Sequence, residues 1–365
     1  MKIILSGGGT GGHIYPAISI ANKVKEKYPD ADILFIGTAG GMESNIVPKE
    51  GYAIKFITVN YLKRKFSLHN IKSVAALFKG IFEARKIIKD FKPNIVVGTG
   101  GFVCGPVVYA ASKLKIKTII HEQNVFPGLT NRILDRYVDK IALSFEEAEK
   151  YFKNKNKPVV TGNPIRSDFF NVTEEEAKAR YNINSDIPLV LVVGGSGGAF
   201  KINNAVIHIL NKYNPLKFKL ILVTGKRLYE QTIKSVKRQD SLKNHSIVSY
   251  IDDMPYALKA CDLIVCSAGA ITIAEVTAVG KPAILIPKAY TAEDHQQYNA
   301  NAMAAKGAAF VINENELNGE ILNKKIQEIL NDREVLKSME TASKRGAIID
   351  AADRIYNEID KLLNS

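Results

Sequence analysis

The stretch SGGGTGGHIYP, residues 6–16, decides how the fold is interpreted. It follows the apolar run KIIL and precedes AISIANKV, whose apolar residues recur at helical spacing, so the chain opens with a strand, a glycine-rich turn and a helix. Gly7, Gly9 and Gly12 match the G-x-G-x-x-G pattern of dinucleotide sites, but the next predicted strand, DILFIG, does not end in the acidic residue that would bind a ribose. No Gly-Lys-Ser/Thr follows the glycines, which excludes a P-loop.

The glycines still point to an anionic ligand. Backbone N–H groups can approach a ligand closely where no side chain intervenes, and the start of a helix favours negative charge. Two further glycine-rich stretches follow predicted strands, GTGGFVCGP at 98–106 and GGSGGAF at 194–200. Ligands of open α/β sheets bind at the carboxyl ends of the strands, so we expect the three loops to surround one phosphate-binding cleft.

Strand-like and helix-like runs alternate along the chain, and the opening pattern restarts at residue 189. Seven apolar runs precede residue 163 and six follow it, and helical segments separate nearly all of them. This alternation is typical of parallel sheets covered on both faces. We therefore predict an α/β protein with two Rossmann-like doubly wound domains facing each other across a cleft, residues 1–163 and 164–345. The last helix, about residues 346–365, is expected to pack back on the first domain.

The net charge of +13 is concentrated in the first half of the chain. Residues 1–163 contain 25 Lys and Arg against 13 Asp and Glu, whereas residues 164–365 contain 25 against 24. Within residues 61–92, nine basic and two acidic residues accompany an apolar stripe at helical spacing. Such a stripe either belongs to the core or binds an anionic membrane surface. The predicted membrane patch comprises Ile71, Phe78, Ile81 and Phe82 with Lys63, Arg64 and Lys65.

The sequence also argues against several features. No apolar run reaches about 18 residues, so no transmembrane helix is expected. The apolar run before the first glycines is too short for the core of a signal peptide. The three cysteines, Cys104, Cys261 and Cys266, show neither a disulfide framework nor metal-ligand spacing, so we expect buried thiols.

Eight motifs occur in order across nearly the whole chain: GGTGGHIYP, GTGGFVCGP, HEQN, GNPIR, VVGGSGGA, IDDMPYAL, SAGAITIAE and DHQQYNA. Together they resemble the MurG family of bacterial peptidoglycan glycosyltransferases. The resemblance implies the GT-B fold and an inverting transfer of N-acetylglucosamine from UDP-N-acetylglucosamine (UDP-GlcNAc). The implied acceptor is the C4 hydroxyl of N-acetylmuramic acid (MurNAc) in lipid I, which is undecaprenyl-diphosphate-MurNAc-pentapeptide, and the implied product is lipid II.

The resemblance also implies a peripheral position on the cytoplasmic face of the cell membrane. It is also compatible with other cell-wall synthesis or division proteins as partners. Binding to nucleic acid is not expected. No metal or cofactor is expected. The D-A-D at residues 30–32 has the letters of the D-x-D motif of metal-dependent glycosyltransferases. It lies in a predicted turn before a strand, so we do not interpret it as a metal site.

Residues of the first domain are assigned to the chemistry. A base must take the proton of the acceptor hydroxyl, and the leaving diphosphate needs positive potential. The resemblance implies that His13, whose side chain type titrates near neutrality, is catalytic; a bracing role in the loop is the alternative. Glu122 is the competing base, or it orients its neighbours. The residues expected near the donor sugar and diphosphate are Thr10, Gly11, Gly12 and Asn124.

The second domain is expected to hold the nucleotide. Ser196 follows a strand at a helix start, where its hydroxyl can meet a phosphate. Glu275 is predicted in the first turn of a helix, where its carboxylate could accept both ribose hydroxyls; compensation of the helix dipole is the alternative. The resemblance assigns to UDP-GlcNAc the further residues Arg166, Ile251, Gly269, Ala270, Ile271, Thr272, Gln296 and Gln297. Asp294 is expected to be an N-cap.

Other functions remain open at this point. A UDP-sugar 2-epimerase shares the GT-B fold but needs no lipid acceptor, so a basic apolar patch would be unexplained. A non-catalytic nucleotide-sugar-binding module would not need His13 or two domains. A related glycolipid synthase with a diacylglycerol acceptor is disfavoured only by the motifs.

Overall fold

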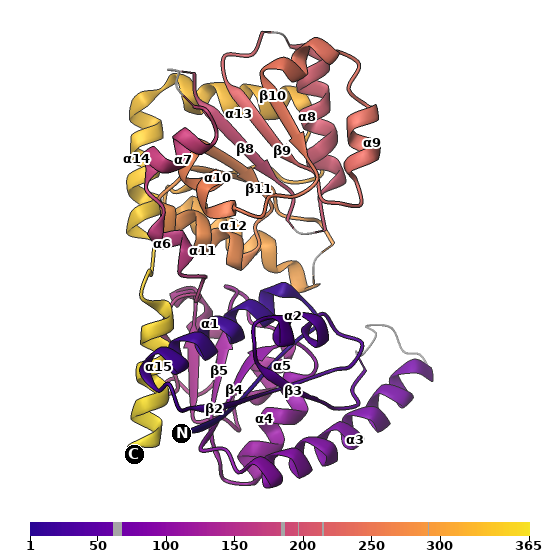
Figure 1. Cartoon of the computed structure of the whole chain (residues 1–365), viewed down its shortest axis with the longest axis vertical. Helices are drawn as coiled ribbons and strands as arrows, with labels where there is room; N and C mark the ends of the chain where they lie inside the picture. Colours follow the sequence, from indigo (N-terminus) through magenta and orange to yellow (C-terminus); the bar gives the residue numbers. More distant parts are fainter. Residues whose placement is uncertain (61–67, 184–186, 196, 214, 291) are drawn as a thin grey trace. The chain divides into compact units, whose positions relative to one another are not determined.

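The computed structural model describes residues 1–60, 68–183, 187–195, 197–213, 215–290 and 292–365. It divides the chain into two units, which Figure 1 shows with their element labels. Unit 1 comprises Met1–Arg166 and Ile348–Ser365, and unit 2 comprises Ser167–Ala347. The predicted boundaries, 163/164 and about 346, lie within a few residues of these divisions.

Unit 1 is built on a seven-stranded sheet in the order β3-β2-β1-β4-β5-β6-β7, and every pair of neighbours is parallel. The strand order reverses between β1 and β4, so the loops after these two strands flank the point where such sheets bind ligands. The strands are β1 Lys2–Gly7, β2 Asp32–Gly37, β3 Ala53–Phe56, β4 Ile95–Gly100, β5 Lys117–Glu122, β6 Lys140–Leu143 and β7 Pro158–Val160.

Helices connect these strands and cover the sheet of unit 1 (Figure 1). They are α1 Gly11–Lys27, α2 Glu43–Lys49, α3 Leu68–Phe91, α4 Cys104–Lys113, α5 Leu129–Leu134, the 3₁₀ helix η1 Glu146–Tyr151 and the carboxyl-terminal α15 Ala351–Leu363. Helix α15 packs beside α1, with Ile355 and Ile359 fully buried in the same hydrophobic cluster as Ile14. The preceding helix, α14, belongs to unit 2, so only the last helix returns to unit 1.

Unit 2 repeats the architecture with a six-stranded parallel sheet in the order β10-β9-β8-β11-β12-β13. Its strands are β8 Leu189–Val193, β9 Lys219–Val223, β10 His245–Val248, β11 Leu263–Cys266, β12 Ala283–Leu285 and β13 Ala309–Val311. The order reverses between β8 and β11. The prediction of an α/β protein with two Rossmann-like domains is therefore confirmed.

The helices of unit 2 flank this sheet. They are α6 Asp168–Asn171, α7 Glu174–Arg180, α8 Phe200–Lys212, α9 Tyr229–Lys234, α10 Met254–Ala260, α11 Ala270–Val279, α12 His295–Ala305, α13 Gly319–Asn331 and α14 Arg333–Arg345, with 3₁₀ helices η2 Gln239–Lys243 and η3 Ala292–Asp294. The three cysteines are free and buried, as predicted. Within the described residues, we find no helix that combines the length and the apolar character needed to cross a bilayer.

Helix α3 exposes part of the predicted membrane patch. Phe78 and Phe82 are 67% and 72% exposed, and Val74 on the same side of the helix is 44% exposed. Ile81, which we expected to widen this face, is instead partly buried against the hydrophobic core of unit 1. It shares the inner side of the helix with the fully buried Ile88, one heptad further on. The other predicted members fall outside the described residues, namely Lys63, Arg64, Lys65 and the side chain of Ile71.

Candidate active site

The glycine turn after β1 places His13 in the first turn of α1, whose N-cap is Thr10. The Nδ1 atom of His13 lies 3.0 Å from the carbonyl oxygen of Gly8 and 3.4 Å from Oγ1 of Thr10. Because a carbonyl can only accept, the hydrogen bond to Gly8 requires the proton on Nδ1. The neutral ring then carries its basic nitrogen at Nε2, which is the form that a proton acceptor needs.

The loop after β4 packs against the loop that carries His13. The hydroxyl of Thr99 donates to the backbone carbonyl of His13 at 2.7 Å. Gly100 has φ of +103°, and a Cβ there would lie only 2.8 Å from Cδ2 of His13. A Cβ at Gly101 would lie 2.4 Å from the carbonyl oxygen of Gly8. These glycines therefore allow the two loops at the switch point of unit 1 to touch.

Glu43, which the sequence did not single out, braces the same turn from α2. Its side chain is almost fully buried, and it accepts hydrogen bonds from the Gly9 N–H at 3.0 Å and from the hydroxyl and N–H of Thr38 at 2.7 and 2.9 Å. Burial alone would raise the pKa of Glu43, but these hydrogen bonds outweigh it and lower the pKa. The buried carboxylate of Glu43 thus fixes the glycine turn. The two are 34 positions apart, and no sequence pattern predicted this contact.

Glu122 holds the loop that follows β5. Its buried carboxylate accepts four hydrogen bonds, from the N–H and side-chain amide of Asn124, the N–H of Gly128 and the side-chain amide of Asn131, at 2.8–3.2 Å. Burial raises the pKa of Glu122, and these donors oppose that effect. Because both oxygens are engaged within the loop, the contacts favour the orienting role over the role of base. They also bring the predicted sugar ligand Asn124 to Glu122.

His121, the first residue of HEQN, links three segments of unit 1. The ring is fully buried, and its Nε2 atom lies 3.0 Å from the carbonyl oxygen of Gly162. The amide of Gln123 donates to its Nδ1 at 3.0 Å and to the carbonyl of Thr99 at 2.7 Å. Burial lowers the pKa of His121 to about 4, with the contact to Gly162 acting in the opposite direction. The imidazole is therefore neutral and structural near neutral pH.

We expect this histidine to make folding stability depend on pH. Between about pH 6.5 and 4 the unfolded chain binds a proton that the folded His121 does not, so stability falls as the pH falls, by roughly 3 kcal/mol in total. His121→Gln keeps a donor near Gly162 but cannot titrate. In urea unfolding at pH 7, 5.5 and 4.5, the wild type should lose more stability than the variant. Equal losses would show that His121 binds its proton alike in both states.

The glycine loop after β8 forms the corresponding edge of unit 2. Gly198, with φ of +73°, touches the loop after β9, since a Cβ there would lie 2.3 Å from the carbonyl oxygen of Thr224. The hydroxyl of Ser267, which follows β11, donates to the carbonyl of Gly194 at 3.2 Å. Three loops thus converge beside β8 and β11. Ser196, the predicted phosphate ligand in this loop, lies outside the described residues.

Helix α11 begins earlier than predicted. It starts at Ala270 with Gly269 as its N-cap, so Ala270, Ile271 and Thr272 form the first turn. Glu275 therefore lies in the second turn, which corrects our prediction. No glycine or proline after Gly269 interrupts the helix, so nothing stops it from starting directly after that residue. The first-turn N–H groups of α11 have no acceptor within the helix and lie at the carboxyl end of β11, where the positive end of the helix dipole favours an anion.

The predicted glutamines occupy the first turn of α12. The Gln296 side-chain oxygen accepts the N–H of Lys288 at 3.0 Å, and the Gln297 amide donates to Asn301 at 3.0 Å. Asp294 is the N-cap residue, as expected, but its side chain makes no capping hydrogen bond. Ile251 is buried just after β10, and Arg166 is exposed at the last position of the first segment of unit 1.

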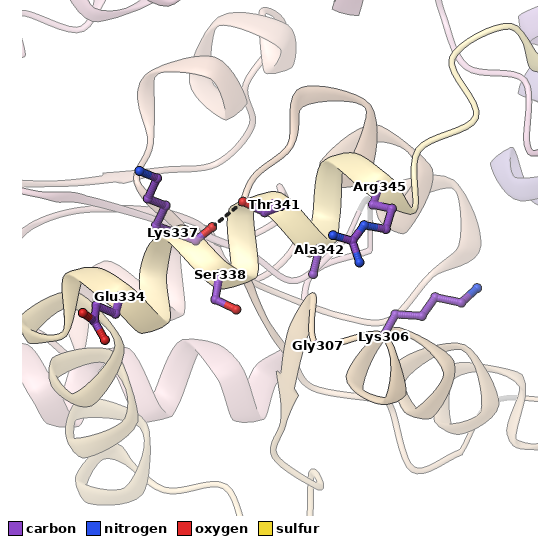
Figure 2. Close-up of a pocket in the computed structure, with 8 residues that line it drawn as sticks. All are labelled: Lys306, Gly307, Glu334, Lys337, Ser338, Thr341, Ala342 and Arg345. Atoms are coloured by element: carbon purple, nitrogen blue, oxygen red, sulfur yellow. Dashed lines mark hydrogen bonds between the residues drawn. The ribbon is translucent and has the colours of Figure 1, made fainter.

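A separate pocket of about 440 Å³ lies on α14 and the turn after α12 (Figure 2). Figure 2 shows its lining residues, which are Lys306, Gly307, Glu334, Lys337, Ser338, Thr341, Ala342 and Arg345. None of the predicted site residues is among them. The predicted site residues lie instead near the loops at the carboxyl ends of the strands, in unit 1 and in unit 2 separately.

The solved structures that are similar to this chain include a MurG transferase and a UDP-GlcNAc 2-epimerase. Acinetobacter baumannii MurG is similar with a TM-score of 0.80 and 27% sequence identity, over 99% of each chain. A UDP-GlcNAc 2-epimerase from Neisseria meningitidis, solved bound to UDP-GlcNAc, is similar with a TM-score of 0.70 at 16% identity, over 99% of this chain and 100% of that one. At so low an identity, the second likeness shows a shared fold alone.

Comparison with known sequences is more specific. The N-terminal domain of glycosyltransferase family 28 matches residues 3–143, and its C-terminal domain matches residues 189–355. A relative from Alkaliphilus oremlandii is 72% identical over 363 residues, covering 100% of this chain and 99% of that protein. Its name is UDP-N-acetylglucosamine–N-acetylmuramyl-(pentapeptide) pyrophosphoryl-undecaprenol N-acetylglucosamine transferase. With both domains matched and such a relative along its whole length, the chain belongs to glycosyltransferase family 28 and, within it, to the MurG transferases.

Proposed function

We propose that this protein transfers N-acetylglucosamine from UDP-GlcNAc to the C4 hydroxyl of MurNAc in lipid I, and so makes lipid II. The observation that carries this proposal is the relative that is 72% identical over the whole chain and is named for this donor and acceptor. The interlocked glycine loops at the carboxyl edge of each sheet support it, because they offer backbone N–H groups to diphosphates.

In this reaction the acceptor oxygen attacks the anomeric carbon as the bond to UDP breaks, with inversion. His13 takes the proton of the acceptor hydroxyl at Nε2, since Nδ1 donates to Gly8. The hydrogen bonds from Thr99 to the backbone carbonyl of His13 and from Gly9 to Glu43 fix the backbone of the glycine turn. The fixed backbone in turn orients the ring of His13. UDP leaves as a stable anion, so no strong acid is required.

The nucleotide of the donor occupies unit 2 in this proposal. The diphosphate lies against the glycine loop after β8 and the first turn of α11, which begins at Ala270. Glu275 accepts the ribose hydroxyls from the second turn of the same helix. Ile251 binds uracil through its backbone, and Gln296 and Gln297 bind sugar hydroxyls. The remaining proposed donor contacts are Thr10, Gly11, Gly12, Asn124, Arg166, Ser196, Gly269, Ile271 and Thr272.

A first test of this function measures the release of UDP from UDP-GlcNAc in the presence and absence of lipid I. A transferase releases UDP in proportion to the acceptor supplied. A 2-epimerase would instead convert the donor without any acceptor, and UDP-N-acetylmannosamine would accumulate. Conversion that is independent of lipid I would overturn the proposal.

We expect Glu43→Gln to slow the reaction without weakening the donor complex. Gly9 and Thr38 donate to different oxygens of Glu43, and glutamine replaces one of these oxygens by an NH2 group that cannot accept, so the turn that orients His13 should shift. Turnover should fall by about 10- to 100-fold. The affinity for UDP, measured by calorimetry, should stay unchanged.

Glu50→Gln is the matched control, since Glu50 is the exposed C-cap of the same helix. It should leave turnover unchanged. If both variants were slowed equally, or if Glu43→Gln turned over like the wild type, a positioning role for Glu43 would be wrong.

We further propose that unit 1 binds the cytoplasmic face of the cell membrane through α3. The exposed apolar side of α3, defined by Val74, Phe78 and Phe82, supports this proposal. Among the residues of this helix whose side chains the structure describes, Lys79, Arg85, Lys86 and Lys89 are basic and exposed. Such residues contribute about 1 kcal/mol each beside an anionic surface. A lipid-linked acceptor requires an enzyme that can reach this surface.

Phe78→Ser with Phe82→Ser should weaken binding to anionic vesicles by roughly 10- to 100-fold at every salt concentration, because apolar insertion is lost. Charge reversal of Lys79, Lys86 and Lys89 should weaken binding most at low salt, because the Debye length falls from about 10 Å at 0.1 M to about 3 Å at 1 M. Co-sedimentation with anionic and neutral vesicles measures both effects.

Phe170→Ser, which removes a 42% exposed phenylalanine from unit 2, is the control and should bind vesicles like the wild type. UDP affinity should not change in any of these variants. Equal binding of the wild type to anionic and neutral vesicles would refute the electrostatic part of the proposal.

A further inference from the structure

Lys288 reaches the glycine loop of unit 2 from a distant part of the chain. It follows β12, and its Nζ donates to the carbonyl oxygen of Gly198 at 3.0 Å. Since β11 lies between β12 and β8 in the sheet, the side chain reaches from one loop past the end of a strand to another. A Cβ built at Gly195 would lie 4.0 Å from the same nitrogen. The ammonium group therefore stands beside the glycine loop after β8.

The backbone around Lys288 is fixed from two other elements. Its N–H donates to the side-chain oxygen of Gln296 at 3.0 Å, and the N–H of Ala289 donates to the carboxylate of Glu314 at 3.0 Å. Gln296 belongs to α12, and Glu314 follows β13. The position of the lysine is thus built into the fold of unit 2, unlike that of a solvated surface lysine.

The surroundings of Lys288 disfavour its charge in the absence of an anion. Burial lowers the pKa of Lys288, and the carboxylate of Glu314 acts in the opposite direction. A half-buried ammonium beside a glycine loop gains stability when an anion binds next to it. The glycine loop after β8, which Lys288 contacts, is also one of the two places to which the donor diphosphate is assigned above.

We infer that Lys288 contacts the diphosphate of the nucleotide-sugar donor and supplies a positive charge that the backbone N–H groups alone do not. This inference rests on the proposed function. Lysine binds phosphate as a compact point charge with rotatable donors, so the hydrogen bond to Gly198 can be kept or exchanged when the ligand enters. The same charge would stabilise UDP as it leaves.

The competing explanation is that Lys288 only ties two loops together. The two explanations differ in their dependence on phosphate. A direct contact matters more for UDP than for UMP, and it does not matter for uridine. A structural tie affects the nucleoside and the nucleotides alike.

Calorimetry with uridine, UMP and UDP therefore tests the inference. Lys288→Met should weaken UDP binding by about 10- to 100-fold, UMP binding less, and uridine binding not at all. Lys288→Arg should recover most of the loss, because it restores the charge. Lys281→Met is the matched control: it removes a lysine at the amino end of β12, where Lys281 lies near Glu174, and it should leave UDP affinity unchanged.

Equal weakening of all three ligands in Lys288→Met, or unchanged UDP affinity, would overturn the inference while leaving the proposed function in place. If Lys288→Met proves unstable, Lys288→Arg and Lys288→Gln provide the same comparison, with full affinity for UDP in the glutamine variant counting against the contact. Failure of the wild-type protein to bind UDP would instead overturn the proposed donor and this assignment with it.

Discussion

Replacing His13 with alanine should lower turnover by about 10²- to 10⁴-fold, which is the range for removal of a general base. UDP affinity should be nearly unchanged, because the nucleotide is assigned to unit 2. The loss of rate on the acid side of the pH profile should also disappear, since that limb reports protonation of the base. Steady-state kinetics with lipid I at a series of pH values, together with calorimetry, would measure all three effects.

A second substitution separates proton transfer from bracing of the loop. His13→Asn places an amide N–H near the position of Nδ1, so it can still donate to the carbonyl of Gly8, but it cannot take a proton. We expect it to be as inactive as His13→Ala. Recovery of activity in His13→Asn would show that the hydrogen bond to the turn, and not basicity, is what the reaction needs.

Glu275→Ala should weaken UDP binding by roughly 2–4 kcal/mol, about 30- to 1000-fold, through the loss of two charge-assisted hydrogen bonds to the ribose. The position of Glu275 in the second turn of α11 leaves the first turn of that helix to the diphosphate. Calorimetry with UDP and with 2′-deoxy-UDP measures the effect. The variant should discriminate less between the two ligands than the wild type does.

The deoxy ligand makes this assignment specific. If Glu275 binds the ribose, its removal and the removal of the 2′ hydroxyl are not additive, because they break the same hydrogen bond. Fully additive losses, or unchanged UDP affinity in a folded Glu275→Ala protein, would show that this carboxylate acts elsewhere.

The architecture was predictable because its determinants are local. Each apolar run that we read as a strand is a strand, and the central strands β1, β4 and β8 are buried on both faces and almost continuously apolar. The glycine turns after β1, β4 and β8 were also visible in the sequence. The start of α11 and the buried side of Ile81 were predicted wrongly, because a helix boundary and the exact orientation of a helix depend on packing that spacing does not encode.

The residues that support the candidate site were hidden for a different reason. Glu43 reaches the turn at Gly9 from 34 positions away, and Lys288 reaches Gly198 from 90 positions away. In both cases the partner is a backbone group, which every residue has, so no pairing of side-chain types marks the contact in the sequence. His121 and Gln123 lay within a recognised motif, but only their burial and hydrogen bonds distinguish them from ligand-binding residues.

The identity of the labelled product tests the proposed function most directly. The purified protein would be incubated with UDP-GlcNAc labelled in the sugar and with vesicles that contain either lipid I or diacylglycerol. The label should move to lipid I, giving lipid II, and should not appear on diacylglycerol. Label on diacylglycerol, or its recovery as UDP-N-acetylmannosamine with neither lipid labelled, would contradict the proposed reaction.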